Sequence, residues 1–282
     1  MTRDLITQVQ NTWCPGCGNF AIEHTLKDVI AGLIEEGVPR ETIVLVTGIG
    51  CHAKMADYLD VNSFYAIHGR TLPVATGIKL ANPELTVICC AGDGDAYAEG
   101  LDHLIFAAKR NIDITLVVHD NRVYGLTTGQ YTPTSPLDFE GRSTPEGSVE
   151  PPINPLELVL ASGACYIARS CTRKLDHLRE TLNGAVHFRG FSFVDVLQVC
   201  ATFYNLSSYY DDRVYPLEDH DPEDFKKALD KIREWDYNAD TRIALGVFYT
   251  RERTIFDDAF RKPSQSDSER SRAIRGLITE RS

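Results

Sequence analysis

Short apolar runs alternate with amphipathic segments along most of the chain, and this alternation constrains the fold more than any other feature. A continuous apolar run is typical of a strand buried on both faces of a parallel sheet. The segments between the runs carry apolar residues at helical spacing and end at glycine, proline or asparagine, as crossover helices do. The runs are TIVLVT (42–47), FYAIH (64–68), TVICCAG (86–92), ITLVVH (114–119), CYIAR (165–169) and FVDVLQV (193–199). We therefore predict an α/β fold with a doubly wound, mostly parallel sheet.

The predicted strands and helices occupy the first 203 residues, so we expect residues 1–203 to form one α/β domain with an N-terminal segment. Residues 204–282 continue with an aromatic-rich stretch, a helical pattern and one more apolar run. We expect this part to be a C-terminal extension that packs on the domain or on a partner subunit. Residues 127–156 interrupt the alternation with a loop rich in proline, threonine, serine and glycine, and a loop of this length is usually functional.

The charge balance and the cysteines exclude several classes of protein. The 29 lysines and arginines and 40 aspartates and glutamates give a formal net charge of −11, which argues against nucleic acid or an anionic membrane surface as a partner. The chain has neither a secretory leader pattern nor an apolar stretch of the roughly 18 residues that a membrane span needs. We expect a cytoplasmic protein, in which the eight cysteines are not structural disulfides.

The turn after the first predicted strand imitates a dinucleotide-binding turn. Gly48-Ile49-Gly50-Cys51-His52-Ala53 has the GxGxxA pattern and precedes a predicted helix. A nicotinamide site also needs an acidic residue about 20 positions later, at the end of the next strand, to bind the ribose. That strand ends at His68-Gly69, without an acidic residue, so the dinucleotide interpretation is disfavoured.

The turn after the next buried run, Gly92-Asp93-Gly94-Asp95, carries more information. Taken alone, it also fits a tight turn followed by a helix N-cap. However, Asn121 follows the neighbouring strand after a further 26 residues, and the carboxyl ends of parallel strands meet at one edge of the sheet. Asp93 and Asn121 offer oxygen ligands that suit Mg²⁺, while the glycines and the helix N-terminus suit a diphosphate. The pattern therefore favours a diphosphate–Mg²⁺ site.

The GDGD and DN motifs at this spacing resemble the thiamine diphosphate motif. Six motifs in order resemble the β subunit of 2-oxoacid:ferredoxin oxidoreductases of the small-subunit type, from about residue 10 to residue 250: WCPGCG, GIGC, HGR-x-x-P-x-A-x-G-x-K, GDGDAY-x-EG, DN-x-x-YGLT-x-GQ and LQ-x-C-x-TFYN. The resemblance implies the diphosphate-binding half of a thiamine diphosphate fold. It also implies that a 2-oxoacid, CoA and oxidised ferredoxin give acyl-CoA, CO₂ and reduced ferredoxin, or the reverse carboxylation.

The N-terminal stretch TWCPGCG (12–18) is compatible with a redox dithiol, a zinc knuckle or an iron–sulfur site. A thioredoxin-like site has its proline and glycine in the opposite order and follows a strand, and a zinc site needs a second knuckle that this chain lacks. The resemblance implies one [4Fe–4S] cluster, held by Cys14, Cys17, Cys51 and Cys200. We interpret the other cysteines as structural: Cys89, Cys90, Cys165 and Cys171.

The resemblance also assigns roles at the cofactor site. Asp93, Asn121 and the carbonyl of Val123 are the expected Mg²⁺ ligands. His68 is a candidate contact to diphosphate or substrate, against a role in tying loops together, and His52 and Lys54 are candidate substrate contacts, against an ordinary role at a helix start. Thr128 is expected to influence which substrate side chain fits. The residues expected around the cofactor are Gly50, Cys51, His68, Gly92, Asp93, Gly94, Asp95, Asn121, Val123, Gly125, Leu126 and Thr127.

The chain has no room for the pyrimidine-binding domain whose glutamate activates the thiamine ring. The resemblance therefore implies an α subunit and a dimer of αβ heterodimers. Because no C-x-x-C-x-x-C-x-x-x-C-P run is present, one cluster is expected and ferredoxin is the outside acceptor. The motifs favour 2-oxoglutarate as substrate and leave pyruvate and branched 2-oxoacids open. A thiamine enzyme without redox function and a zinc-stabilised binding module are the rival interpretations.

Overall fold

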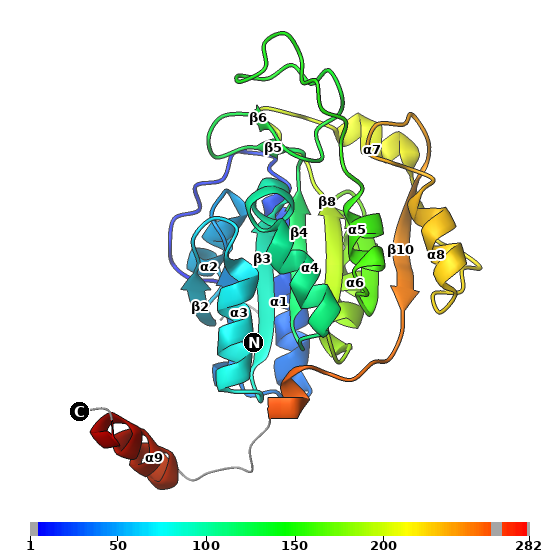
Figure 1. The fold of residues 1–282 in the computed structure, drawn as a ribbon. Helices are drawn as coiled ribbons and strands as arrows, with labels where there is room; N and C mark the ends of the chain where they lie inside the picture. Colours follow the sequence, from blue (N-terminus) through cyan, green and yellow to red (C-terminus); the bar gives the residue numbers. More distant parts are fainter. Residues whose placement is uncertain (1–4, 261–266, 281–282) are drawn as a thin grey trace.

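One eight-stranded sheet organises the protein (Figure 1). The computed structural model describes residues 5–260 and 267–280. Neighbouring strands run parallel except β10 and β7, which are antiparallel. The spatial order is β2 (Asn62–Tyr65), β1 (Ile43–Thr47), β3 (Thr86–Gly92), β4 (Thr115–Asp120), β8 (Ser192–Leu197), β7 (Tyr166–Cys171), β10 (Ile243–Thr250) and β9 (Val214–Pro216). The predicted doubly wound, mostly parallel fold is confirmed.

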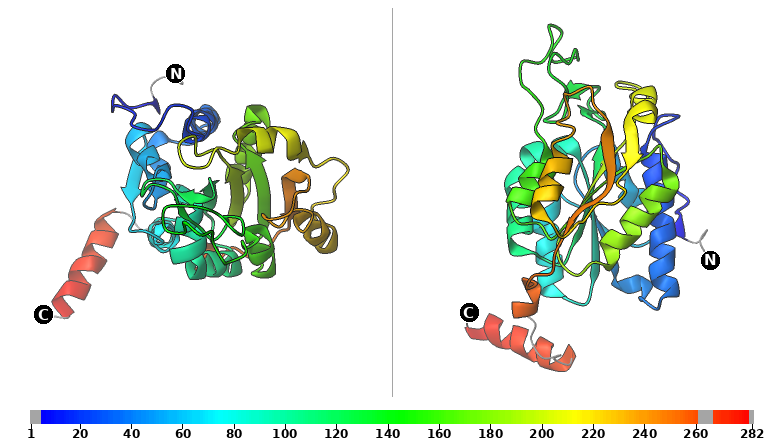
Figure 2. Two further views of the ribbon diagram at one scale, coloured as in Figure 1. Left: turned by 90° about the horizontal axis from the view of Figure 1, so that it is seen from above. Right: turned by 90° about the vertical axis from the view of Figure 1, so that its right-hand side faces the viewer.

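Helices cover both faces of the sheet, as the side view in Figure 2 shows. One apolar core joins the sheet to α3 (Thr71–Ala81), α4 (Leu101–Arg110), α5 (Pro155–Ala161) and α8 (Phe225–Ile232). The core on the opposite face joins it to α1 (Asn19–Glu35), α2 (Met55–Tyr58) and α6 (Leu175–His187). Cys89 and Cys90 show why the central runs must be apolar throughout, because these successive side chains of β3 are both fully buried, one in each core.

Two predicted strands differ from expectation. The run at 64–68 is expected to be buried on both faces, but β2 ends at Tyr65 and is an exposed edge strand. Phe64 and Ile67 are 50% and 76% exposed, because no further strand or helix among the described residues covers that edge. The apolar run of the C-terminal extension becomes β10, which inserts beside β7 as a full member of the sheet.

The carboxyl edge of the sheet carries the irregular structure. A π-helical turn, Asp95–Glu99, and the 3-10 turn η3 (His52–Lys54) follow two strand ends. The small hairpin of β5 (Val123–Tyr124) and β6 (Gln130–Tyr131) follows β4, and the long loop after it rises above the sheet at the top of Figure 1. The predicted loop at 127–156 therefore lies at this edge.

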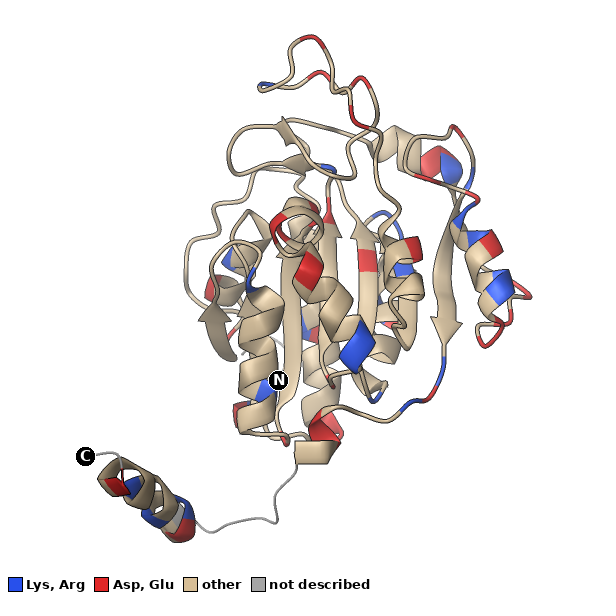
Figure 3. Cartoon of the chain, in the orientation of Figure 1, with Lys and Arg blue, Asp and Glu red and all other residues tan. Residues whose placement is uncertain are grey.

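The rest of the extension is arranged around the sheet margin. Helix α7 (Ser207–Arg213) packs in a third small core with Trp235 and Tyr237, whereas α9 (Asp267–Glu280) lies apart from the sheet layers in both views of Figure 2. Acidic and basic segments are interspersed over the helices and loops in Figure 3. In the part of the chain that the structure describes, no helix has the length and apolarity required to cross a bilayer.

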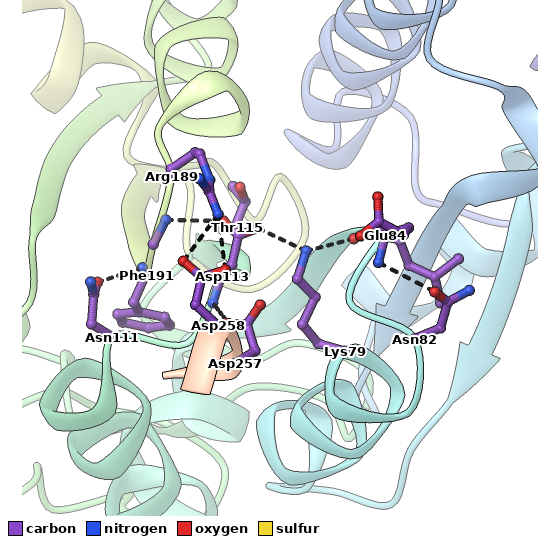
Figure 4. Close-up of polar contacts among 12 residues, drawn as sticks. Lys79, Asn82, Glu84, Asn111, Asp113, Thr115, Arg189, Phe191, Asp257 and Asp258 are labelled. Atoms are coloured by element: carbon purple, nitrogen blue, oxygen red, sulfur yellow. Dashed lines mark hydrogen bonds and ion pairs between the residues drawn. The ribbon is translucent and has the colours of Figure 1, made fainter. Parts of the chain in front are cut away.

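The amino edge of the sheet is closed by a compact polar network (Figure 4). The buried Lys79 ammonium lies 2.7 Å from Asp113 Oδ2 and donates to the Leu85 carbonyl at 2.8 Å. Asp113 Oδ1 accepts the amide proton of Gly190, and the Asp113 amide donates to Asp257 Oδ1. These contacts join the segments that precede β3, β4 and β8 to the segment that follows β10, at the end remote from the predicted site.

Candidate cofactor site

The carboxyl edge of the sheet brings the predicted motifs together around one cavity. Turns after β1, β3 and β4 form its walls, because these strands are parallel neighbours and end at the same edge. All residues predicted to contact the cofactor lie in its lining, which consists of Ile49, Gly50, Cys51, His52, His68, Gly92, Asp93, Gly94, Asp95, His119, Asn121, Val123, Tyr124, Gly125, Leu126, Thr127 and Gln198.

Packing within the protein accounts for part of the glycine pattern. A Cβ atom on Gly94 would lie 2.2 Å from Cε1 of Tyr124, so the Tyr124 ring leaves no room for a side chain at this position. A Cβ atom on Gly92 would lie 2.9 Å from Nδ1 of His52. The sequence pattern predicts that both glycines let the diphosphate approach the backbone closely. In the structure, both glycines also leave space for neighbouring side chains, Tyr124 and His52.

Asp93 lies at the centre of this edge as a buried carboxylate. Its Oδ2 accepts a hydrogen bond of 3.0 Å from Thr134 Oγ1, and the same hydroxyl oxygen lies 2.9 Å from Asp120 Oδ1. Burial, with a smaller effect of Asp195, raises the pKa of Asp93 to about 6. Burial and the neighbouring carboxylates also raise the pKa of Asp120 well above its ordinary value. The site therefore gathers more negative charge than it neutralises.

This charge imbalance fits a bound cation. Asp93 supplies a carboxylate, Asn121 an amide group and Val123 a carbonyl, and all three residues line the cavity. Oxygen ligands of this kind are those that Mg²⁺ prefers. Asn121 Oδ1 also accepts the Val123 amide proton at 2.9 Å, which ties these two residues into one tight turn. We conclude that the residues present are compatible with a Mg²⁺-bound diphosphate.

Asp95 holds two histidines beside the cavity. Its carboxylate lies 3.3 Å from His52 Nε2 and 3.4 Å from His68 Nδ1, and it accepts the Gly69 amide proton at 2.5 Å. Although burial raises the pKa of Asp95, hydrogen bonds from His52 and Gly69 and the nearby histidine charge lower it below its ordinary value. Asp95 is expected beside the diphosphate, and its oxygens are engaged by these protein groups.

The two histidines differ in exposure. Both line the cavity, but the His52 side chain is only 5% exposed, whereas that of His68 is 31% exposed. His68 Nδ1 also lies 3.3 Å from Glu99 Oε2, so it sits between two carboxylates. His68 is therefore the one of the two with ready access to a ligand.

Three buried polar residues at this site were not predicted from the sequence: His119 and Gln198 line the cavity, and Asn19 contacts His119. His119 Nδ1 lies 2.8 Å from Asn19 Oδ1, and burial lowers the pKa of His119 well below its ordinary value, so this ring is neutral. His119 Nε2, Asn19 Nδ2 and Gln198 Oε1 are buried without a hydrogen-bond partner among the described residues. A histidine at the end of an otherwise apolar strand was the signal that could have identified this cluster.

The four predicted cluster cysteines line a second cavity. Gly125 lies between the two cavities, since a Cβ atom there would lie 3.7 Å from the Sγ atoms of both Cys51 and Cys200. Trp13 Nε1 donates to the Cys51 carbonyl at 2.6 Å. The full lining is Thr12, Trp13, Cys14, Cys17, Cys51, Lys54, Asn121, Gly125, Leu126, Thr128, Cys200, Ala201, Thr202 and Phe203.

The chemistry of these thiols fits a multinuclear group better than a single ion. Burial, together with the neighbouring Cys51, Cys200 and Cys14, raises the pKa of Cys17 to about 11, so the site needs positive charge to hold thiolates. Within residues 5–260 and 267–280, no three His, Cys, Asp or Glu side chains are placed to bind one metal ion. In a four-iron cluster each thiolate binds a different iron atom, which suits sulfurs spread around a cavity.

Lys54 and Thr128 lie at this second cavity and are not part of the first. The Lys54 ammonium donates to Thr12 Oγ1 at 2.8 Å, next to the cysteines. The structure thus separates Lys54 from His52 and His68, the other candidate substrate contacts. The cysteines expected to be structural are fully buried away from both cavities: Cys89, Cys90, Cys165 and Cys171.

Comparison with known proteins points to one family. Residues 48–196 match the family described as thiamine pyrophosphate enzyme, C-terminal TPP binding domain, and residues 200–264 match the C-terminal family of the pyruvate ferredoxin oxidoreductase beta subunit. The beta subunit of 2-oxoacid:ferredoxin oxidoreductase 1 from Aeropyrum pernix is 41% identical over 257 residues, which cover 86% of this chain and 79% of that protein.

Two further relatives carry the name of a particular 2-oxoacid. The KorB subunit of 2-oxoglutarate oxidoreductase from Mycobacterium tuberculosis is 41% identical over 201 residues, covering 71% of this chain and 53% of that protein. A solved structure of the 2-oxoglutarate:ferredoxin oxidoreductase from Magnetococcus marinus, with 2-oxoglutarate, coenzyme A and succinyl-CoA bound, superposes with a TM-score of 0.85 at 32% identity. The superposition covers 99% of this chain and 90% of that chain.

Proposed function

This chain belongs to the β subunits of the 2-oxoacid:ferredoxin oxidoreductases, and from this premise we propose that it acts in the CoA-dependent oxidative decarboxylation of 2-oxoglutarate, or in the reverse carboxylation. The names of the KorB relatives and of the superposed enzyme favour 2-oxoglutarate. Pyruvate and branched 2-oxoacids are the alternative substrates. A thiamine enzyme without redox function is the alternative reaction class.

The observation that carries this proposal is the shared wall between the two cavities. Asn121, Gly125, Leu126 and Cys51 line both of them. Thiamine diphosphate, when bound, supplies the electron sink for decarboxylation, and an iron–sulfur cluster supplies one-electron transfer. Placing one cavity directly against the other suits an enzyme that combines the two chemistries.

Each group of residues has a defined task in this proposal. Asp93, Asn121 and the Val123 carbonyl hold Mg²⁺, and the remaining residues predicted to contact the cofactor surround its diphosphate. Asp95 fixes the ring positions of His52 and His68, and the exposed His68 contacts diphosphate or substrate. Cys14, Cys17, Cys51 and Cys200 hold one [4Fe–4S] cluster. Burial raises the pKa of Cys51, and the positive charge of Lys54 partly offsets this effect.

We also propose the assembly and the division of the chain. The boundary between the domain of residues 1–203 and the extension of residues 204–282 is supported by the two family matches, which meet between residues 196 and 200. An α subunit with the pyrimidine-binding domain completes the site in a dimer of αβ heterodimers. The exposed apolar edge beside the cavity supports this: Ile49, Phe64, Tyr65, Ile67 and Leu126. Ferredoxin accepts the electrons, and a cytoplasmic location keeps the cluster cysteines reduced.

Anaerobic co-purification with the α subunit tests the proposal. We expect a brown complex with iron and acid-labile sulfide in a ratio of one, and CoA-dependent reduction of a viologen dye that is fastest with 2-oxoglutarate. Faster dye reduction with pyruvate or a branched 2-oxoacid would show that this acid, and not 2-oxoglutarate, is the preferred substrate. A colourless complex with stoichiometric zinc, or decarboxylation without dye reduction, would contradict the proposed oxidoreductase chemistry.

A further inference from the structure

The residue between the two proposed metal-binding positions after β4 has an unusual backbone. Arg122 lies between Asn121 and Val123 and adopts a φ of +62°, in the left-handed region. A side chain with a Cβ atom rarely adopts this conformation unless its surroundings impose it. Arg122 is also 2% exposed, although arginine is seldom buried without partners. The left-handed backbone and the burial of a charged side chain are both unfavourable, so other contacts must stabilise them.

The guanidinium of Arg122 reaches two other segments of the chain. Its Nε donates to the Thr134 carbonyl at 2.7 Å, and its Nη2 donates to the Tyr237 carbonyl. The guanidinium carbon lies 5.5 Å from the ring centroid of Trp235 and 5.8 Å from that of Tyr237. A planar guanidinium can make two directed hydrogen bonds while it stacks on aromatic rings, which a lysine cannot do.

The backbone of Arg122 is held on both sides as well. Its amide donates to Asp120 Oδ1 at 3.1 Å, and its carbonyl accepts a hydrogen bond of 2.6 Å from Ser135 Oγ. The long loop thus contacts the turn through Thr134 and Ser135, and the C-terminal extension contacts it through Tyr237. Two other segments, the long loop and the C-terminal extension, therefore meet at one residue of the proposed Mg²⁺ turn.

We propose that Arg122 is a positioning residue for the Mg²⁺ site, an inference that rests on the proposed function. By fixing the left-handed turn, it keeps the Asn121 side chain and the Val123 carbonyl directed at the cavity before cofactor arrives. It also makes the C-terminal extension part of the cofactor site without a direct contact to the ligand. Thr134 Oγ1, which hydrogen-bonds Asp93, brings the third proposed ligand into the same network.

A second buried arginine provides a matched control. Arg169 in β7 stacks on the same two rings, 5.0 Å from the Trp235 centroid and 5.2 Å from that of Tyr237. Its polar contacts go to Asp195 Oδ2 at 3.4 Å and to the Tyr237 hydroxyl at 3.2 Å, not to the turn. If burial of a cation against Trp235 were all that mattered, the two arginines would respond alike to substitution.

The test uses the complex with the α subunit and the variants Arg122→Lys, Arg122→Gly and Arg169→Lys. Glycine tolerates the left-handed backbone, so Arg122→Gly removes the side-chain anchor without adding strain. Two quantities are measured: the Mg²⁺ concentration that half-saturates thiamine diphosphate binding, and amide hydrogen exchange of residues 119–126 without cofactor. The thermal unfolding midpoint is recorded for each variant.

We expect Arg122→Gly to raise the half-saturating Mg²⁺ concentration by ~10- to 100-fold, as loss of other supports of metal ligands does, and to accelerate exchange in the turn. Arg122→Lys should give a smaller rise in the same direction. Arg169→Lys should lower the unfolding midpoint and leave the Mg²⁺ dependence unchanged.

Equal Mg²⁺ dependence in Arg122→Lys and Arg169→Lys would overturn the inference, and this comparison decides even if Arg122→Gly does not fold. Unchanged Mg²⁺ dependence in the Arg122 variants, with normal thiamine diphosphate binding by the parent complex, would remove the inference and leave the proposed function standing. A parent complex that binds no thiamine diphosphate would remove both.

Discussion

The two ends of the central sheet use buried polar groups in opposite ways. At the amino edge, the Lys79 ammonium and the Asp113 carboxylate form an ion pair, and both make further hydrogen bonds to the backbone (Figure 4). At the carboxyl edge, Asp93 and Asp120 lie close to the same hydroxyl oxygen, and neither is matched by a salt bridge among the described residues. The charges at the amino edge are paired within the chain, whereas those at the carboxyl edge would be balanced by the proposed cation.

Buried polar atoms without a hydrogen-bond partner follow the same division, with two exceptions at the amino edge. Within the described part of the chain, His119 Nε2 and Gln198 Oε1 line the cofactor cavity without partners, and Asp120 Oδ2 lies nearby in the same condition. At the amino edge, two buried oxygens of the described residues also have no partner, Asp257 Oδ2 and Ser192 Oγ, although Asp257 Oδ1 accepts the Asp113 amide proton. From this contrast we expect substitutions at the amino edge to lower the free energy of unfolding and substitutions at the carboxyl edge to weaken cofactor binding. The following substitutions test that separation.

The largest effect on stability is expected from Lys79→Met. This substitution leaves the Asp113 carboxylate without its cation, and breaking a buried ion pair in this way costs about 3–5 kcal/mol of unfolding free energy. Chemical denaturation of the chain provides the measurement. Thiamine diphosphate binding by the folded fraction should be unchanged, and a weaker binding would show that the two edges are not independent.

Asp93→Asn is the matching substitution at the carboxyl edge. It removes a proposed Mg²⁺ ligand, so we expect cofactor affinity to fall by ~100-fold in calorimetric titrations of the αβ complex. The cofactor-free chain should be at least as stable as the parent, because a buried carboxylate without a cation is lost. A clear loss of stability without loss of binding would reverse the assignment of the two edges.

Much of this site could be predicted because parallel strands place sequence motifs at one edge. The turns at Asp93 and Asn121 follow adjacent strands, so their meeting required only the topology that the apolar runs indicated. The four motif cysteines line one cavity although Cys14 and Cys200 are far apart in sequence, and the resemblance grouped them. Local pattern alone would not have paired them.

The features that the sequence did not predict depend on tertiary contacts, which local sequence does not encode. The exposure of Phe64 follows from the absence of a covering element among the described residues, while its apolar pattern is that of a buried strand. Arg122 has no local signal for a left-handed backbone, because its anchors come from Thr134 and Tyr237. His119 was missed because a polar residue in a strand gives no sign of which segment it will contact.

The pH dependence of stability should also distinguish the edges. The folded-state pKa of Asp93 is about 6, above its ordinary value of 3.8, so the folded chain binds more protons than the unfolded chain between these values. This group therefore lowers the unfolding free energy as the pH rises from about 4 to 6, by on the order of 2 kcal/mol, and adds no further change above.

Urea denaturation of the cofactor-free chain at several pH values measures this effect. The difference between the parent and Asp93→Asn isolates the contribution of this carboxyl group from other groups that titrate in the same range. A parent chain that gains stability over this interval relative to Asp93→Asn would mean that Asp93 already has a positive partner.

The smallest predicted effect concerns a single unpartnered oxygen. Gln198 is fully buried at the base of the cofactor cavity, and its Oε1 accepts no hydrogen bond among the described residues. Gln198→Met keeps the shape of the side chain and removes this oxygen, so we expect the cofactor-free chain to gain about 1 kcal/mol. Cofactor affinity should fall if this oxygen receives a hydrogen bond from the ligand or its water.

Thr115→Val is the control for this change at the other end of the sheet. Thr115 Oγ1 donates to the Ala185 carbonyl at 3.2 Å, so the substitution removes a satisfied hydrogen bond and should cost about 1 kcal/mol. Opposite signs for the two substitutions in denaturation experiments would establish that polar groups at the carboxyl edge are held ready for a ligand. Equal losses would mean that Gln198 already has an internal partner, such as an ordered water, and that the contrast between the edges is limited to their charged groups.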